Sequence, residues 1–156
     1  RSRAGFAINI ICVHTKWMEK ISTHVAETPH PPETLYRLWA APMTWASWDP
    51  DVAEVQFSGD AILGASGWMR PSSGPATTFE IVALETDRLL TTTSRMPGAK
   101  LFFEHRAEPL DINTRVTVTI GVDGPLRWLW RRVLGKSFAG AAERNVRGLI
   151  DYLDAA

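Results

Sequence analysis

Residues that could do acid–base chemistry fall on predicted strands that are otherwise apolar. On the strand expected over residues 100–108, Leu101 and Phe103 would face the core, and a period of two then turns His105 inward as well. A neutral imidazole can take up or return a proton near neutral pH. Arg95 or Arg70 could hold the negative oxygen that forms when a proton is removed beside a ketone. His105 with one of these arginines therefore has the parts for proton abstraction followed by loss of water.

The same polar residues also have a purely structural interpretation. Leu89 carries Thr91, Thr93 and Arg95 to one side of the strand expected over residues 88–96. A buried charge needs a partner, so this arginine would sit in a buried ion pair or reach water near the strand end. The nearest candidate partners in the sequence are Asp49, Glu80 and Glu104, the last on the wrong side of its strand.

Asp49 is a further, weaker acid–base candidate. It stands directly before Pro50, and an Asp-Pro pair is more often a turn than a catalytic group.

Aromatic residues are concentrated in the middle of the chain. Trp39, Trp45 and Trp48 lie within ten residues of one another, and Trp68 follows on a nearby strand. Their flat faces suit stacking on a ring system, although tryptophan is also ordinary core for a small domain. The side chains we expect to line a ligand pocket are Trp39, Trp45, Trp48, Phe57, Trp68, Arg70, Thr93, Phe103 and Phe138.

The sequence does not point to a metal or a cofactor. The four histidines, His14, His24, His30 and His105, lack metal-ligand spacing, and the single cysteine, Cys12, excludes a cysteine-based zinc site and an internal disulfide. His24 is expected at the surface from its place in the first strand. We find no phosphate-binding glycine loop and no nucleophile-elbow motif.

These residues would be positioned by a mainly antiparallel sheet. A first strand is expected over residues 20–28, followed by a short helix from Pro32 and a helical turn over residues 44–48. Alternating or β-branched runs with short turns then predict about six strands between residues 53 and 122. Because the connections are short, consecutive strands should pair antiparallel.

The last expected element is one long amphipathic helix from Gly124 to Leu153. Apolar residues recur there at steps of three and four, which places them on a single stripe. Of the glycines inside it, Gly135 is expected to mark a bend that opens a cavity. The element order predicts an α+β fold in which a curled sheet of six to seven strands wraps around this helix.

Composition indicates one ordinary globular domain. Of 156 residues, 45% are hydrophobic and 22% charged, and the formal net charge is +0, so no overall field draws the chain to nucleic acid or to an anionic membrane. The basic residues Arg127, Arg131, Arg132 and Lys136 are interpreted as a solvated helix face, with a patch for nucleic acid or lipid headgroups as the less favoured alternative. No apolar run approaches the ~20 residues of a membrane span. The domain is expected over residues 18–156, with residues 1–17 an extension or remnant outside it, and the default location is cytoplasmic.

Three short strings add a resemblance to a known family. They are WASWDPDV at residues 45–52, TRVT at 114–117 and GPL at 124–126. With the element order, they make residues 21–153 resemble the START-like (SRPBCC) helix-grip superfamily, in particular its bacterial polyketide cyclase/dehydrase and lipid-transport group. The resemblance implies a deep cavity between sheet and long helix that accepts apolar or aromatic small molecules. Members share no catalytic residue set, so it assigns no catalytic residue here.

Three functional hypotheses follow. The first is a carrier or binder of a small hydrophobic molecule, such as a lipid or a polyketide-like compound. The second is a cyclase or dehydratase that uses His105 with Arg95 or Arg70 inside one pocket. The third is a protein-interaction module that uses the sheet or the basic helix face, and a homodimer is left open.

Overall fold

The structure, a computed structural model, describes residues 18–156. Its strands are β1 (Glu19–Thr28), β2 (Val52–Gln56), β3 (Ser66–Pro71), β4 (Thr77–Glu85), β5 (Leu89–Met96), β6 (Ala99–Pro109) and β7 (Thr114–Asp123). Its helices are α2 (Pro32–Trp39), the 3-10 turn η1 (Pro42–Thr44), α3 (Trp45–Trp48), α4 (Arg127–Leu134) and α5 (Ala141–Asp154). The expected N-terminal extension, with Cys12 and His14, lies outside the described residues.

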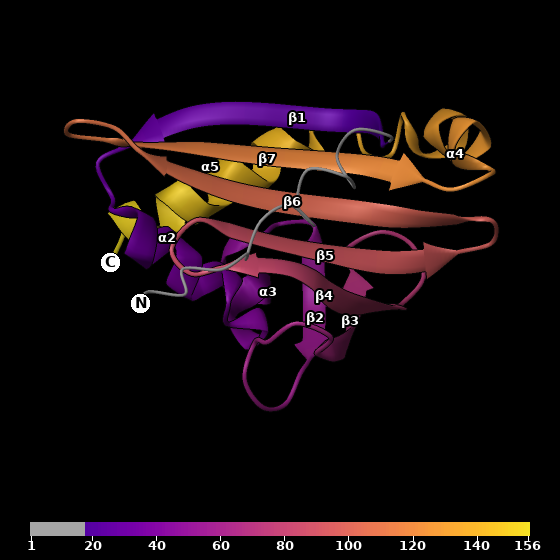
Figure 1. Ribbon diagram of the computed structural model, residues 1–156, viewed down its shortest axis with the longest axis horizontal. Coiled ribbons are helices and arrows are strands. Elements are labelled where there is room, and N and C mark those ends of the chain that lie inside the picture. The colour runs from indigo at the N-terminus through magenta and orange to yellow at the C-terminus, as the bar shows by residue number, and fades with distance from the viewer. Residues whose placement is uncertain (1–17) are drawn as a thin grey trace, which may run out of the picture.

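The strands of the described region form one antiparallel sheet in the order β1-β7-β6-β5-β4-β3-β2. Strands consecutive from β2 to β7 are neighbours because short turns join them, and β1 closes the order by pairing with β7. Figure 1 shows this sheet in front of α5, with α4 at one end, α2 toward the other and α3 below β5 between them. The predicted α+β helix-grip fold, its strands and its short helices are confirmed.

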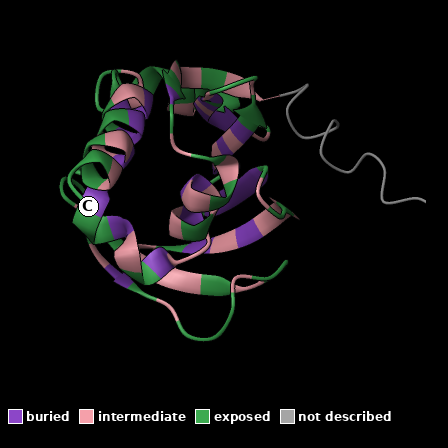
Figure 2. Ribbon diagram, turned by 90° about the vertical axis from the view of Figure 1, so that its left-hand side faces the viewer, coloured by how far each residue is buried: buried purple, intermediate pink, exposed green. Residues whose placement is uncertain are grey.

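The side of the sheet that faces α5 is apolar along its central strands. In β7 the residues Val116, Val118, Ile120 and Val122 alternate onto this side and are almost fully buried. Val146 and Leu149 of α5 are also fully buried within the same core. In Figure 2 the curved sheet partly encloses the helix, whose buried residues lie on its inward side. We call this the inner face of the sheet.

The prediction of one continuous helix from Gly124 to Leu153 is wrong. The chain makes two helices, α4 and α5, with a stretch of turns over residues 135–140 between them. Gly135 keeps a right-handed helical conformation, so the bend expected there is misplaced. The residue that departs from helical geometry is Gly140, with a φ of 75°, a left-handed conformation that glycine adopts without the usual steric cost. The apolar spacing persists across the break and conceals it in the sequence.

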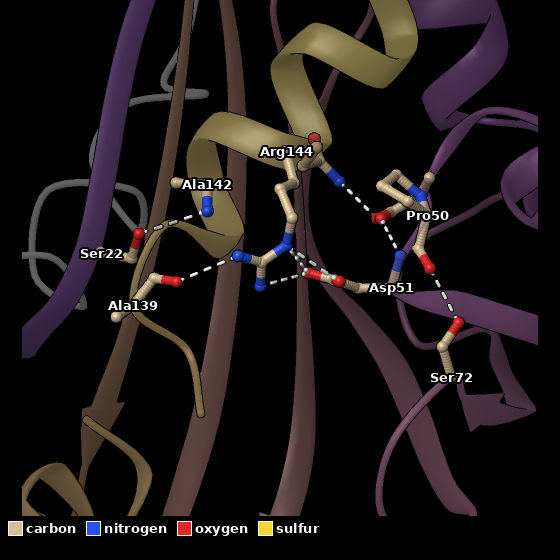
Figure 3. Close-up of polar contacts among 9 residues, drawn as sticks. Ser22, Pro50, Asp51, Ser72, Ala139, Ala142 and Arg144 are labelled. Atoms are coloured by element: carbon tan, nitrogen blue, oxygen red, sulfur yellow. Dashed lines mark hydrogen bonds and ion pairs between the residues drawn. The ribbon is translucent and has the colours of Figure 1, made fainter. Parts of the chain in front are cut away.

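The start of α5 is tied to segments that lie far away in the sequence (Figure 3). The backbone N–H of Ala142 donates to the Ser22 hydroxyl of β1 at 3.2 Å, which satisfies one of the helix's unpaired amides. Arg144 donates two parallel hydrogen bonds, at 3.0 Å from both Nε and Nη2, to the Asp51 carboxylate before β2. Its Nη1 donates to the Ala139 carbonyl at 3.0 Å. These contacts fix the register of α5 against the chain between α3 and β2.

An irregularity in β1 reverses the side on which its later residues point. Lys20 pairs with Gly121 and Ser22 with Ile120, so Ile21 is an extra residue in this strand. Beyond the bulge, His24 lies opposite the buried Val118 on the inner face, while Val25 is 52% exposed. The expectation that His24 lies at the surface is therefore wrong, because a single inserted residue flips the alternation.

Candidate functional site

A buried polar pair joins α5 to the turn after α3. Asn145 is 5% exposed, and its Nδ2 donates a hydrogen bond to Oδ2 of Asp49 at 2.6 Å. The other carboxylate oxygen of Asp49 accepts the backbone N–H of Asp51 at 2.9 Å, the usual hydrogen bond of an Asp-initiated turn. Asp49 is thus both a turn residue, as its Pro50 neighbour suggests, and the polar partner of a helix residue inside the fold.

Burial dominates the ionisation of Asp49. Although the residue as a whole is half-buried, its carboxyl group is mostly surrounded by protein, and this raises its pKa from 3.8 to about 6. The hydrogen bonds from Asp51 and Asn145 stabilise the carboxylate and reduce the shift without cancelling it. At neutral pH the group is therefore ionised but close to its titration.

His105 points to the inner face, as its parity predicted. It lies between Leu90 of β5 and Val118 of β7 and is 7% exposed. Burial lowers its pKa from 6.5 to about 4, so the imidazole is neutral at pH 7. The Leu90 carbonyl and the Asn145 side chain lie near enough to oppose this shift in part. Neither makes a hydrogen bond of good geometry with the ring, and both ring nitrogens are unpaired among the described residues.

Unpaired polar atoms gather around this histidine. The ring of Trp39 lies over it with centroids 5.4 Å apart, and Trp39 Nε1 finds no acceptor in the described part of the chain. Asn145 Oδ1 is likewise without a donor there. Buried polar groups are nearly always paired, so three neighbouring side chains with spare hydrogen-bonding capacity are unusual. Together they offer the indole N–H as donor, the amide oxygen as acceptor, and the neutral imidazole as both. We call Trp39, Asp49, His105 and Asn145 the polar cluster.

Aromatic side chains are numerous in the same core on the inner side of the sheet. Trp45 and Phe79 have ring centroids 4.9 Å apart, Phe57 stacks on Phe79 at 6.0 Å, and Phe103 meets Phe138 at 6.1 Å. Trp45 and Trp48 are buried with their indole nitrogens satisfied by the Trp39 carbonyl and the Thr44 hydroxyl. The predicted pocket residues on this side therefore come together in one apolar region, in which Trp45 and Trp48 also serve as core.

The remaining predicted residues lie on the opposite, outer face. Thr93 pairs with Phe102 and Arg95 with Lys100, whereas Leu90 pairs with His105. Leu90 is an odd number of positions from Thr93 and from Arg95, so these two residues point to the face opposite that of His105. The ladders through β4 and β3 put Trp68 and Arg70 on this same outer face. Arg70 is exposed and paired with Glu54 at 3.2 Å. The requirement that His105 converge with Arg95 or Arg70 in one pocket is therefore not met, because the sheet separates them.

The outer-face residues do meet one another. Trp68, Thr93, Arg95 and Glu80 line a half-open hollow of about 370 Å³ over β3, β4 and β5. This hollow is distinct from the polar cluster, since the backbone of the sheet lies between them.

Sequence reasoning missed Asn145. It is three residues after Ala142 and four before Leu149, so it falls on the apolar stripe of α5 although its side chain is polar. A lone amide on an otherwise buried helix face is the signal that could have revealed it.

Two further observations describe what the chain holds. Between residues 18 and 156, no group of three or more His, Cys, Asp or Glu side chains is arranged to bind a metal ion. In the same part of the chain, no helix has the length and apolarity needed to pass through a bilayer.

Residues 18–154 match the model of a family described as polyketide cyclase / dehydrase and lipid transport. No functionally curated protein matches the chain.

Several solved structures share the fold. The protein NE0264 from Nitrosomonas europaea superimposes with a TM-score of 0.69 at 11% identity, covering 90% of this chain and 96% of the other. The Zhui aromatase/cyclase from Streptomyces sp. R1128 gives 0.69 at 13% identity, with 88% and 94% covered. A START superfamily protein from Mycobacterium smegmatis gives 0.64 at 12% identity, with 86% and 99% covered.

Proposed function

The chain belongs to the polyketide cyclase / dehydrase and lipid transport family, and on that premise we propose that it binds a small, neutral, largely apolar molecule at the polar cluster. The observation that carries the proposal is the unused hydrogen-bonding capacity of Trp39, His105 and Asn145 inside a core rich in aromatic side chains. Sites for small molecules combine such apolar walls with a few converging polar groups.

The chemistry of the polar cluster favours a hydroxyl or carbonyl group on the ligand. The Trp39 indole N–H can donate to an acceptor on the ligand, and the Asn145 amide oxygen can accept from a donor. The neutral His105 ring can donate or accept. A negatively charged ligand group is disfavoured, because His105 is neutral at pH 7 and the ionised Asp49 carboxylate is bound to Asn145. A phenol, an enol or a ketone fits this arrangement.

The proposal is tested with 2-naphthol and naphthalene, which differ by one hydroxyl. We expect the wild-type protein to bind 2-naphthol more tightly, and Asn145→Leu to weaken 2-naphthol about tenfold by removing one hydrogen bond while leaving naphthalene unchanged. Titration followed by tryptophan fluorescence gives both dissociation constants. Thr93→Val, on the outer face, is the matched control and should change neither. Equal affinity for the two probes, or none for either, would contradict the proposal.

A second function, catalysis on a bound ketone, is favoured by the neutrality of the buried His105. At pH 7 the imidazole is unprotonated, so a ring nitrogen has a lone pair to offer a ketone's α-proton, although its pKa of about 4 makes it a weak base. The Trp39 N–H nearby could stabilise the enolate oxygen. The family description and the aromatase/cyclase among the similar structures support the same reaction class. In contrast to the sequence-based hypothesis, Arg95 and Arg70 have no part in it.

This second function predicts that the protein accelerates exchange of the α-protons of 2-tetralone with deuterated water. His105→Gln should abolish the acceleration while leaving the affinity for 2-naphthol within about threefold of wild type, because glutamine can still hydrogen bond. Proton NMR measures the exchange, with the Arg95→Gln variant as the control that should remain active. Exchange that survives in His105→Gln would exclude His105 as the base.

A further inference from the structure

Helix α4 contributes little to the core. None of its residues is buried, and only Trp130 and Leu134 pack partly against the core cluster. The helix is held by the Trp130 indole, which donates to the Pro97 carbonyl at 2.8 Å, and by the Leu126 N–H, which donates to the Gly98 carbonyl at 2.9 Å. Its other side faces away from the protein at the end of the sheet (Figure 1). Because α4 packs against the protein through only two side chains, one of its faces has no partner among the described residues.

That unpartnered face is apolar and basic at once. Trp128 is 64% exposed and Val133 56%, and Leu129 is exposed beside them. At 100° per residue, Arg132 falls between Trp128 and Leu129 on the same face. Lys136 is exposed in the turns directly after the helix. Among the described residues these two cations have no ion pair, whereas Arg131 lies 3.5 Å from Glu19.

The charge of this region is one-sided. No acidic residue occurs between Asp123 and Glu143, although the chain as a whole has a formal net charge of +0. Four basic side chains, those of Arg127, Arg131, Arg132 and Lys136, are therefore concentrated on and just after one eight-residue helix.

We propose that α4 docks the protein on an anionic lipid bilayer, with Trp128, Leu129 and Val133 entering the interface and the basic side chains at the headgroups. Interfacial helices combine these residue types, and their cations attract acidic lipids. Nucleic acid would use the basic side chains but would leave Leu129 and Val133 in water. A second copy of the same face would bring two basic surfaces together with no acidic residue between them.

The proposal is tested by co-sedimentation of the full chain with vesicles of phosphatidylcholine alone and with vesicles that also contain phosphatidylserine. We expect binding to the anionic vesicles only, falling as salt is raised. The charge variant Arg132→Gln with Lys136→Gln should bind about 25-fold more weakly, since each basic residue contributes roughly fivefold at such a surface. The apolar variant Leu129→Ser with Val133→Ser should lose about tenfold or more.

Matched controls are available at the other end of the sheet. Arg37→Gln with Arg88→Gln removes two exposed cations, and Ile112→Ser removes an apolar side chain that is 87% exposed in the β6–β7 turn. Neither should change vesicle binding.

Three results would overturn the proposal. One is no binding to anionic vesicles, and another is an equal loss in the controls. The third is tighter binding to an oligonucleotide that depends on the basic side chains but not on Leu129 and Val133. All the substituted side chains are exposed, so circular dichroism should report an intact fold throughout.

Discussion

Replacing Asp49 with asparagine is expected to cost the protein about 3 kcal/mol of stability, relative to wild type, when the pH is lowered from 7 to 4. The wild-type protein is largely protected from this loss, because two buried groups titrate in opposite senses over nearly the same range. The variant removes the titration of Asp49, so the opposing effect of the second group is no longer offset.

The second group, whose effect is then no longer offset, is the buried His105. Its pKa falls from 6.5 in the unfolded chain to about 4 in the folded protein. Below pH 6.5 the unfolded state takes up a proton that the folded state refuses, so folding is progressively disfavoured until the pH reaches the folded pKa of about 4. A shift of this size corresponds to about 3 kcal/mol.

The protecting group is Asp49, whose shift has the opposite consequence. Its pKa rises from 3.8 to about 6 on folding, so the folded state takes up the proton first as the pH falls. Its contribution to stability is complete below pH 3.8 and is lost as the pH rises through about 6. Acidification therefore stabilises the protein through Asp49 by about 3 kcal/mol, which offsets the loss through His105.

Urea denaturation at a series of pH values measures both effects. Relative to wild type, Asp49→Asn should become less stable towards pH 4, and His105→Gln should become more stable by a similar amount, about 3 kcal/mol. Glu33→Gln, which removes an exposed carboxylate without a partner among the described residues, should follow wild type. If all four stability curves run parallel, the two groups are not buried as described.

The second large effect is expected at Gly148, where alanine should destabilise the protein by about 3 kcal/mol despite its better helix propensity. A Cβ at this position would lie 2.1 Å from the Trp48 carbonyl oxygen and 3.1 Å from Cδ of Pro50. The first of these atoms is backbone at the end of α3, so the overlap is relieved only if α5 moves away from α3. That movement would also stretch the hydrogen bond between Asn145 and Asp49.

Thermal and urea denaturation measure the loss, and the affinity for 2-naphthol reports whether the polar cluster is disturbed with it. Arg147→Ala, at the preceding position of α5, is the control, since its side chain is 72% exposed and makes only an (i, i+4) pair with Glu143. It should change stability by no more than about half a kcal/mol. Equal effects of the two substitutions would mean that α5 and α3 are not in close contact at Gly148.

The fold could be predicted from the sequence because its determinants are local. Strand alternation, short turns and the apolar spacing near the C-terminus together specify a sheet that wraps a helix. The errors arose where one residue changes the geometry without changing the pattern. Turns over residues 135–140, with Gly140 left-handed directly before α5, interrupt the helix while the three- and four-residue steps continue across them. In β1, Ile21 inverts the parity without any proline or glycine to mark it.

The candidate site was only partly accessible to the same reasoning. Parity along β6 placed His105 correctly on the inner face, because that strand has no bulge before it. Parity along β5 correctly grouped Thr93 with Arg95 on one side of that strand. The pattern of β5 alone does not tell whether this side lies on the same face of the sheet as His105 of β6. That depends on the register Leu90–His105, which the β5–β6 turn sets. The link from Asn145 to Asp49 spans 96 residues and emerges only in three dimensions.

The break at residues 135–140 also separates the two C-terminal helices as units of local unfolding. Opening α5 would expose Val146 and Leu149 and so requires most of the molecule to come apart, whereas detaching α4 would free little more than Trp130 and Leu134. In a continuous helix, the unfolding of the α4 segment would be coupled to that of the α5 segment. Because the helices are separate, α4 can detach from the sheet many times for each global unfolding of the protein.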